Sequence, residues 1–204
     1  MTRRVVLFLD YQNVYKGARE TFHQQWEPSQ YGQIDPMKLG RLLVERNPGR
    51  DGRTLIGVRV YRGQPDSSKE PRAYGANLRQ CSAWERVGAT VITRTLRYPR
   101  AWPAEKPEEK GIDVALAMDF HAMAVRGDYD VGILMSTDTD LKPALEAVAQ
   151  INQNRSPRCE VAAWSAPTMH SRRLSITGTK VWCHWLGPGD YKAVADLTNY
   201  AVDL

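Results

Sequence analysis

Residues 5–10 read VVLFLD, a continuous apolar run that ends in an acid. A run without polar alternation is typical of a central strand that is buried on both faces, as in a parallel sheet. Residues 129–136, YDVGILMS, show the same pattern and lead to Asp138 and Asp140. Because the carboxyl ends of neighbouring parallel strands open onto one crevice, we expect Asp10, Asp138 and Asp140 to lie close together although they are far apart in the sequence.

The segments around these two strands alternate between helical and extended patterns. Helices are predicted over residues 13–22, 36–46, 70–87, 111–126 and 140–151. Further strands are predicted over residues 54–63, 89–96, 158–164 and 180–186, the last at an edge of the sheet. Strands that alternate with helices favour an α/β fold in which helices cover both faces of a mainly parallel sheet.

Length and composition indicate one domain. With 204 residues, of which 42% are hydrophobic, the chain is long enough for one sizeable core and short for two. We expect a single domain over residues 1–204, with its core in about residues 5–164 and a C-terminal extension, 165–204, that packs on it. No apolar run approaches the roughly 18 residues of a membrane helix, and Asp10 interrupts the first run before a signal peptide could form. A cytoplasmic protein without a membrane partner is expected, with its three cysteines as reduced thiols because they lack metal-binding spacing.

Positive charge is concentrated in the first part of the chain. The formal net charge is +5, but residues 1–110 hold 20 Lys and Arg against 12 Asp and Glu, whereas residues 111–204 hold 8 against 11. Basic side chains that neutralise phosphates gain affinity for nucleic acid by releasing counterions. The basic part is therefore a candidate for binding an anionic polymer, although a solvated surface that keeps the protein soluble explains the charge equally well.

Four aspartates form the candidate catalytic and metal site: Asp10, Asp113, Asp138 and Asp140. Asp113 opens the apolar stretch GIDVALAMDFHAM, directly after the proline-rich, charged loop 97–110, and this loop is expected beside the crevice. Carboxylates that lie close together repel one another unless a proton or a cation relieves the repulsion. Hard divalent ions such as Mg²⁺ and Mn²⁺ prefer an all-oxygen shell of this kind.

Several of the acids have competing structural explanations, and for Asp113 the alternative is an ordinary acid at a helix start. Asp119 follows Asp113 by six residues, about 240° around a helix, so the two do not face one ion. We therefore expect Asp113 to be the ligand and Asp119, a charge in an apolar helix, to be a supporting or structural acid. A helix-capping role is a stronger alternative for Asp140 than for Asp138.

Polar neighbours of the aspartates are expected to support the site. Asn13, three residues after Asp10, is placed to orient that carboxylate or to contact a phosphate, although both residues are also favoured as helix caps. Ser136 and Thr137 stand at a strand end that starts a helix, where hydroxyls and backbone N–H groups favour an anion. Phosphate and metal therefore suit the same place.

Other catalytic arrangements lack their motifs. The four histidines show no metal-binding spacing, and the sequence holds no G-x-S-x-G, Walker loop or G-x-G-x-x-G. A phosphatase of the haloacid dehalogenase type needs Asp-x-Asp after the first strand, but Gln12 stands at the second aspartate position.

Three segments together resemble the NYN domain, a branch of the PIN-like nucleases that includes LabA-like proteins. They are LFLDYQNVY (7–15), KGIDVALAMD (110–119) and ILMSTDTDLKPAL (133–145), and the resemblance covers about residues 5–150. It implies a PIN-like three-layer α/β/α sandwich and metal-dependent cleavage of RNA. The four aspartates match the family's acidic site and Asn13 matches the Asn after its first acid, whereas Tyr11 and Thr137 stand where the family often has Gly.

The resemblance implies an endoribonuclease with Mg²⁺ or Mn²⁺ as cofactor. Single-stranded or looped RNA is the expected substrate, because stacking and recognition of base edges need unstacked bases. The residues expected to contact the RNA backbone are Lys110, Lys142, Arg97 and Arg62, with Arg59, Arg72, Arg79 and Arg94 as further candidates. Those expected to stack on bases are Trp102, Tyr98 and Tyr15. The alternative is a non-catalytic RNA-binding or adaptor module of the same fold, and the oligomeric state stays open, a homo-oligomer included. For Trp182, Trp185 and Tyr191, core packing is favoured over a partner surface.

Overall fold

The computed structural model describes residues 2–46, 51–151, 157–167 and 171–202. Its strands are β1 (Arg3–Asp10), β2 (Arg53–Gln64), β3 (Thr90–Thr95), β4 (Val131–Met135), β5 (Arg158–Trp164) and β6 (Trp182–Leu186). Its helices are α1 (Tyr11–Phe22), α2 (Pro36–Glu45), α3 (Pro71–Arg86), α4 (Ile112–Arg126), α5 (Lys142–Ile151) and α6 (Pro188–Val194). A short 3-10 helix, η1 (Thr139–Leu141), directly precedes α5.

The six strands of the described chain run parallel in one sheet with the order β3-β2-β1-β4-β5-β6. The chain therefore winds outward in one direction from β1 to β3 and in the other from β4 to β6. This confirms the predicted α/β fold with a parallel sheet. In such sheets a crevice opens beyond the carboxyl ends of the strands where the winding direction reverses, which here is between β1 and β4.

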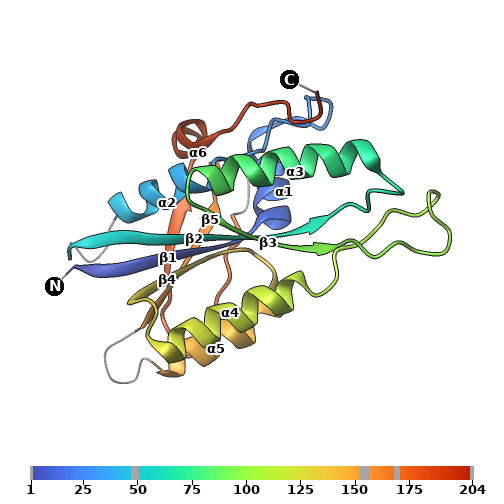
Figure 1. Ribbon diagram of the computed structural model, residues 1–204. Coiled ribbons are helices and arrows are strands. Elements are labelled where there is room, and N and C mark those ends of the chain that lie inside the picture. The colour runs from blue at the N-terminus through green and yellow to red at the C-terminus, as the bar shows by residue number, and fades with distance from the viewer. Residues whose placement is uncertain (1, 47–50, 152–156, 168–170, 203–204) are drawn as a thin grey trace.

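Helices cover both faces of the sheet (Figure 1). α1, α2, α3 and α6 lie on one face, and α4 and α5 lie on the other. β1 lacks polar alternation because it is buried on both faces. Val5, Leu7 and Leu9 pack into the core on the first face, and Val6 and Phe8 pack into the core on the second. Asp10 continues the second set, so its carboxylate is directed to the side on which α4 lies.

The C-terminal region differs most from the prediction. α6 is not predicted by the sequence pattern, because Gly187, Pro188 and Gly189 read as a chain breaker although Pro188 in fact opens the helix. Tyr191 on α6 is buried in the core, as expected, and accepts the backbone N–H of Gly32 at 2.7 Å. The same expectation is wrong for Trp182 and Trp185, which are 50% and 40% exposed.

The other element bounds lie within about three residues of the predicted ones, and β5 coincides with the predicted 158–164. No helix in the described ranges has the length and apolar character that crossing a membrane requires.

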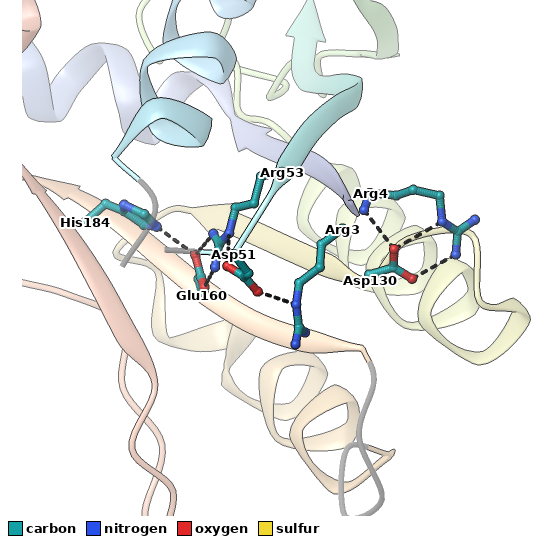
Figure 2. A network of polar contacts seen from close by, with 7 residues as sticks. All are labelled: Arg3, Arg4, Asp51, Arg53, Asp130, Glu160 and His184. Atoms are coloured by element: carbon teal, nitrogen blue, oxygen red, sulfur yellow. Dashed lines mark hydrogen bonds and ion pairs between the residues drawn. The ribbon is translucent and has the colours of Figure 1, made fainter. Parts of the chain in front are cut away.

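Charged residues are paired at the amino end of the sheet (Figure 2). Glu160 on β5 accepts hydrogen bonds at 2.8 and 2.9 Å from Arg53 at the start of β2, and a ring nitrogen of His184 on β6 lies 2.8 Å from the same carboxylate. Burial acts to raise the pKa of Glu160, but the bonds to His184 and Arg53 outweigh it and hold this pKa at about 2. Two more ion pairs lie beside this group, Arg3 with Asp51 and Arg4 with Asp130.

Candidate metal centre

Three carboxylates meet where β1 and β4 end. Asp10 is the last residue of β1, Asp138 follows β4, and Asp113 lies in the first turn of α4. One carboxylate oxygen from each lies within 4.8 Å of the other two. We term Asp10, Asp113 and Asp138 the acidic cluster. Asp140, the fourth aspartate predicted for the site, is exposed and lies outside this group.

Asp10 is buried, with 4% of its surface exposed, and two donors fix it. It caps α1 by accepting the backbone N–H of Asn13 at 3.2 Å, and it accepts the hydroxyl of Ser136 at 2.9 Å. Burial raises the pKa of Asp10 to about 6; the two hydrogen bonds act against this rise, and the charges of Asp113 and Glu109 add to it. The site therefore holds a buried carboxylate whose negative charge is poorly compensated by the protein.

Asp113 reaches the cluster because of how α4 begins. Gly111 precedes the helix with a φ of 76°, a left-handed conformation that residues with a Cβ rarely adopt. The chain then enters α4 with Asp113, half-buried, in its first turn. Burial raises the pKa of Asp113, and the charges of Asp138 and Asp140 raise it further. Asp140 therefore acts on the cluster through its charge.

Asp138 is held by the chain that follows β4. Ser136 accepts the backbone N–H of Asp138 at 3.1 Å while it donates to Asp10, so one hydroxyl links two members of the cluster. Asp138 caps η1 by accepting the backbone N–H of Asp140 at 2.9 Å. The expectation that Asp140 is the stronger capping candidate is wrong, because the chain turns into a 3-10 helix before the regular helix begins.

Asn13 supports the site in a way that differs from its predicted role. Its backbone N–H, rather than its amide, holds Asp10. Its side-chain oxygen accepts the backbone N–H of Thr137 at 3.0 Å and the Thr137 hydroxyl at 3.2 Å. Asn13 thus ties the start of α1 to the loop after β4, which are the two segments that carry Asp10 and Asp138.

Asp119 is engaged by β2. It accepts a hydrogen bond from Arg59 at 2.6 Å and one from the Tyr61 hydroxyl at 2.8 Å. Burial acts to raise the pKa of Asp119, but these two bonds outweigh it and lower that pKa. The pairing gives Asp119 a structural role between α4 and β2, and it also occupies Arg59, one of the arginines considered for RNA binding.

Glu109 is a further carboxylate beside the site that sequence reasoning missed. It accepts the backbone N–H of Gly63 at 2.5 Å, and a Cβ at residue 63 would overlap Cδ2 of Leu96 and lie 2.7 Å from the Cγ of Glu109, so a larger residue there would displace these side chains. Burial raises the pKa of Glu109, and the charge of Asp113 raises it further. The one available signal was its place in the loop expected beside the crevice, four residues before Asp113.

The basic residues predicted to contact RNA differ in exposure and in their surroundings. Lys110 and Arg97 are exposed, and the backbone of Arg97 pairs with that of Glu108 across the 97–110 loop. Lys142 is half-buried at the start of α5. Arg62, near the end of β2, is half-buried between aromatic rings.

The aromatic residues predicted to stack on bases lie in two places. Tyr98 and Trp102 contact each other edge to face in the 97–110 loop, with ring centroids 5.0 Å apart, and the Tyr98 hydroxyl donates to Glu70 at 2.5 Å. Tyr15 on α1 donates to the backbone oxygen of Ser29 at 2.8 Å and faces a cavity.

Two cavities flank the acidic cluster. The first, of about 340 Å³, lies on the β2 side; we term it the Arg62 hollow, and its lining includes Tyr11, Gln12, Tyr15, Arg62 and Glu109. The second, of about 450 Å³, lies on the β5 side; we term it the Trp164 hollow, and its lining includes Asn13, Ser136, Thr137, Trp164 and Arg172. Residues that directly follow Asp10 line one hollow, and residues that directly precede Asp138 line the other. A chain-like ligand that crosses the cluster therefore has room on both sides.

The donor set of the cluster suits a hard divalent cation. Three carboxylate oxygens within 4.8 Å of one another can bind one ion, and the group contains no His or Cys, the ligands that zinc prefers. Mg²⁺ keeps several waters when it binds to one or two carboxylates and a phosphate, so few protein ligands are needed. Asp10 accepts hydrogen bonds through both of its oxygens yet keeps free lone pairs, because a carboxylate has about four acceptor positions.

The comparison with protein families identifies which group shares this arrangement. A family model described as the NYN domain matches residues 4–171, which include every member of the acidic cluster. The chain belongs to the NYN domain family. The resemblance inferred from three short segments is therefore confirmed over most of the chain. NYN domains are a branch of the PIN-like nucleases, which supports a nuclease role for this NYN domain.

Similarity to individual proteins is weak. A crystal structure of a protein of unknown function from Vibrio parahaemolyticus matches with a TM-score of 0.49 and 19% sequence identity, over 79% of this chain and 81% of that chain. A likeness at this level carries no argument about function. No curated protein sequence matches the chain.

Proposed function

We propose that this NYN domain is a metal-dependent endoribonuclease that hydrolyses RNA phosphodiester bonds with Mg²⁺ or Mn²⁺. The acidic cluster carries the proposal, because three carboxylates from three distant segments offer oxygens within 4.8 Å of one another. Like charges gathered in this way oppose ionisation unless a cation compensates them. A hard divalent cation does so and leaves coordination positions for water and a phosphate oxygen.

The residues of the chain have separate tasks in this proposal. Asp10, Asp113 and Asp138 hold the cation, which when bound supplies a water of lowered pKa and positive charge beside the phosphoryl oxygens. Ser136 keeps Asp10 and Asp138 together by bonding to both. Asp140 is exposed beside the cluster, where we propose that it takes up the proton that the attacking water loses.

RNA in a single-stranded or looped form is the proposed substrate. Its backbone meets the basic side chains on the carboxyl side of the sheet, among them Lys110, Lys142, Arg97 and Arg62. The hollows on either side of the cluster have room for nucleotides whose bases are free to leave the stack, and this condition favours single strands over duplexes.

The test compares linear and circular single-stranded RNA of one sequence, each with Mn²⁺, Mg²⁺ or a chelator. Cleavage of both forms is expected only with metal, since a circle has no end from which an exonuclease can start. Asp10→Asn should abolish it. Asp35→Asn is the matched control, because Asp35 caps α2 by accepting the backbone N–H groups of Met37 and Lys38 but lies outside the cluster.

Each outcome of this test has a distinct meaning. Cleavage that persists in chelator, or that is equal in Asp10→Asn, comes from a contaminant and overturns the proposal. Cleavage of the linear form alone indicates an exonuclease. RNA binding without any cleavage supports the adaptor role instead.

A further inference from the structure

No carboxylate among the described residues pairs directly with the charge of Arg62, although Glu109, which lines the same hollow, is close enough for the two charges to interact. The guanidinium of Arg62 lies 4.9 Å from the ring centroid of Tyr11 and 5.3 Å from that of Trp84. Nη1 donates to Gln80 at 2.7 Å, while the buried Nε has no hydrogen-bond partner. The rings flank the guanidinium, which keeps donors beyond those that bond to Gln80 and Cys81.

A cation held in this way favours an anionic ligand. A guanidinium has five N–H donors in a planar fork that matches two oxygens of a phosphate. A charged group that is partly removed from water is unfavourable unless a counter-charge and hydrogen bonds compensate it. Arg62 also lines the hollow, so a ligand in the cavity can reach it.

The other walls of the Arg62 hollow suit a nucleobase. The rings of Tyr11 and Tyr15 stand nearly parallel, 19° apart, with centroids separated by 6.5 Å. Side-chain amides share the lining with these rings, among them Gln12, Gln33 and Asn199. An amide offers both donors and acceptors, as the edge of a base does, and an aromatic ring offers a stacking surface.

The size and place of the hollow point to one nucleotide next to the scissile bond. A volume of about 340 Å³ lies at the lower end of the range for small-ligand sites and is too small for a duplex. Gln12 is two residues from Asp10, and Glu109 in the lining is close enough for its charge to affect Asp10. The Trp164 hollow lacks the comparable feature, because its arginine, Arg172, is exposed.

We propose that the Arg62 hollow binds one unstacked nucleotide of the RNA strand, with a phosphate on Arg62 and the base among Tyr15 and the amides. The inference rests on the proposed function, since it names the part of the substrate that this site holds. It predicts that recognition depends on a base at one position beside the cut.

Binding of a fluorescent single-stranded RNA, measured in chelator with the Asp138→Asn protein, tests the phosphate contact without cleavage. Arg62→Met should weaken binding on the order of tenfold and reduce the slope of log affinity against log salt by about 0.7. Arg62→Lys, which keeps the charge but loses the fork, should weaken binding while leaving the slope unchanged. Arg41→Met, at an exposed arginine on α2, is the matched control and should change neither quantity.

Abasic RNA tests the base contact. Tyr15→Leu should weaken binding of intact RNA on the order of tenfold, and this loss should disappear for an oligonucleotide that lacks the base at the bound position. Gln12→Ala should show the same pattern with a smaller loss. Gln12 is exposed, so this second variant keeps the test valid if Tyr15→Leu does not fold.

The results separate this inference from the proposed function. Arg62→Met that binds RNA like Arg41→Met, with the same salt slope, overturns the inference even if the wild type cleaves RNA. A Tyr15→Leu loss that is equal for intact and abasic RNA also overturns it. Binding that depends on Arg62 and on the base, in a wild-type protein that never cleaves with Mn²⁺, supports the hollow and overturns the ribonuclease.

Discussion

The pKa values of two buried acids at opposite ends of the central sheet are shifted in opposite directions. Glu160 near the amino end and Asp10 at the carboxyl end are each 4% exposed. Burial raises the pKa of Asp10 to about 6, with added charge from Asp113 and Glu109. Burial acts on Glu160 in the same direction, yet His184 and Arg53 hold its pKa at about 2 (Figure 2). The partners of an acid, rather than its depth, therefore distinguish a structural site from a functional one.

The difference has a consequence for stability. We expect the paired acids at the amino end to stabilise the fold and the acidic cluster to destabilise it in the absence of a cation. Such perturbed acids gather at functional sites, because the properties that serve chemistry oppose stability. Substitutions of acid by amide should therefore have opposite effects at the two ends.

The largest effect is expected for Glu160→Gln. It removes the carboxylate that bonds to both Nη atoms of Arg53, whose side chain is 1% exposed, and leaves Asp51, 3.4 Å from Nε, as the remaining carboxylate partner among the described residues. Breaking a buried pair in this way costs about 3–5 kcal/mol of unfolding free energy. The midpoint of thermal unfolding, Tm, should fall by on the order of 10 °C. The double substitution Glu160→Leu with Arg53→Met should recover much of the loss. A fall in unfolding free energy below about 1 kcal/mol would contradict the structural role of this pair.

The next effect has the opposite sign. Without metal at pH 7, Asp10→Asn should raise the free energy of unfolding by about 2–3 kcal/mol, because the pKa of Asp10 is raised from 3.8 to about 6 and Asn remains a good helix cap. A raised folded pKa means that the penalty is present above about pH 6 and is relieved as the pH falls toward 4. Denaturant unfolding of the wild type and the variant should therefore converge over this range.

The control for this prediction is Asp35→Asn, which should leave stability nearly unchanged at every pH. Below about pH 4.5 the wild type and Asp35→Asn should lose stability to the same extent. The pKa of Glu160 lies below its ordinary value of 4.5, so the stability that Glu160 contributes is present above that pH and is lost as the pH falls toward 2. Equal stability of wild type and Asp10→Asn at pH 7 would contradict the proposed strain at the carboxyl end.

A divalent cation should restore the unfolding free energy that the acidic cluster costs at the carboxyl end. Mn²⁺ at a hundredfold excess over its Kd should stabilise the wild type by about 2.7 kcal/mol, visible as a rise in Tm. The rise should vanish in Asp10→Asn, persist in Glu160→Gln and weaken below about pH 6, where a proton competes for Asp10. An equal rise in Asp10→Asn would place the ion elsewhere.

The smallest effect should separate two neighbouring aspartates. Asp138→Asn removes a member of the cluster, whereas Asp140→Asn removes an exposed charge outside it. By calorimetry, Asp140→Asn should weaken Mn²⁺ binding only a few-fold and Asp138→Asn much more, because exposed charges interact weakly through water. Equal losses would show that Asp140 is itself a ligand.

The sequence predicts the fold and the meeting of distant aspartates for the same reason. Short unbroken apolar runs between turn signals favour strands that are buried on both faces, and such strands lie side by side with their ends in one crevice. This reasoning fixes Asp10 and the segment after β4. It does not fix the direction of Asp140, because the 3-10 turn η1 decides that locally.

The sequence does not predict the position of Glu109 or the role of Asn13, and the reason is a different one. The 97–110 loop has no periodicity, and Glu109 is positioned by the backbone of Gly63, which is 46 residues away. Asn13 likewise finds its partner, Thr137, only after β1 and β4 have paired. Contacts of this kind depend on tertiary structure, so local patterns carry no trace of them.

The strand order also means that the acidic cluster is complete only when most of the chain is present. Asp10 is near the start of the chain, while Asp138 joins it only when β4 inserts beside β1, after β2, β3 and α4 have been passed. A nascent or truncated chain that ends before β4 holds one or two of the three ligands and has no complete centre. For the proposed ribonuclease, we therefore expect fragments that end before β4 to have no cleavage activity.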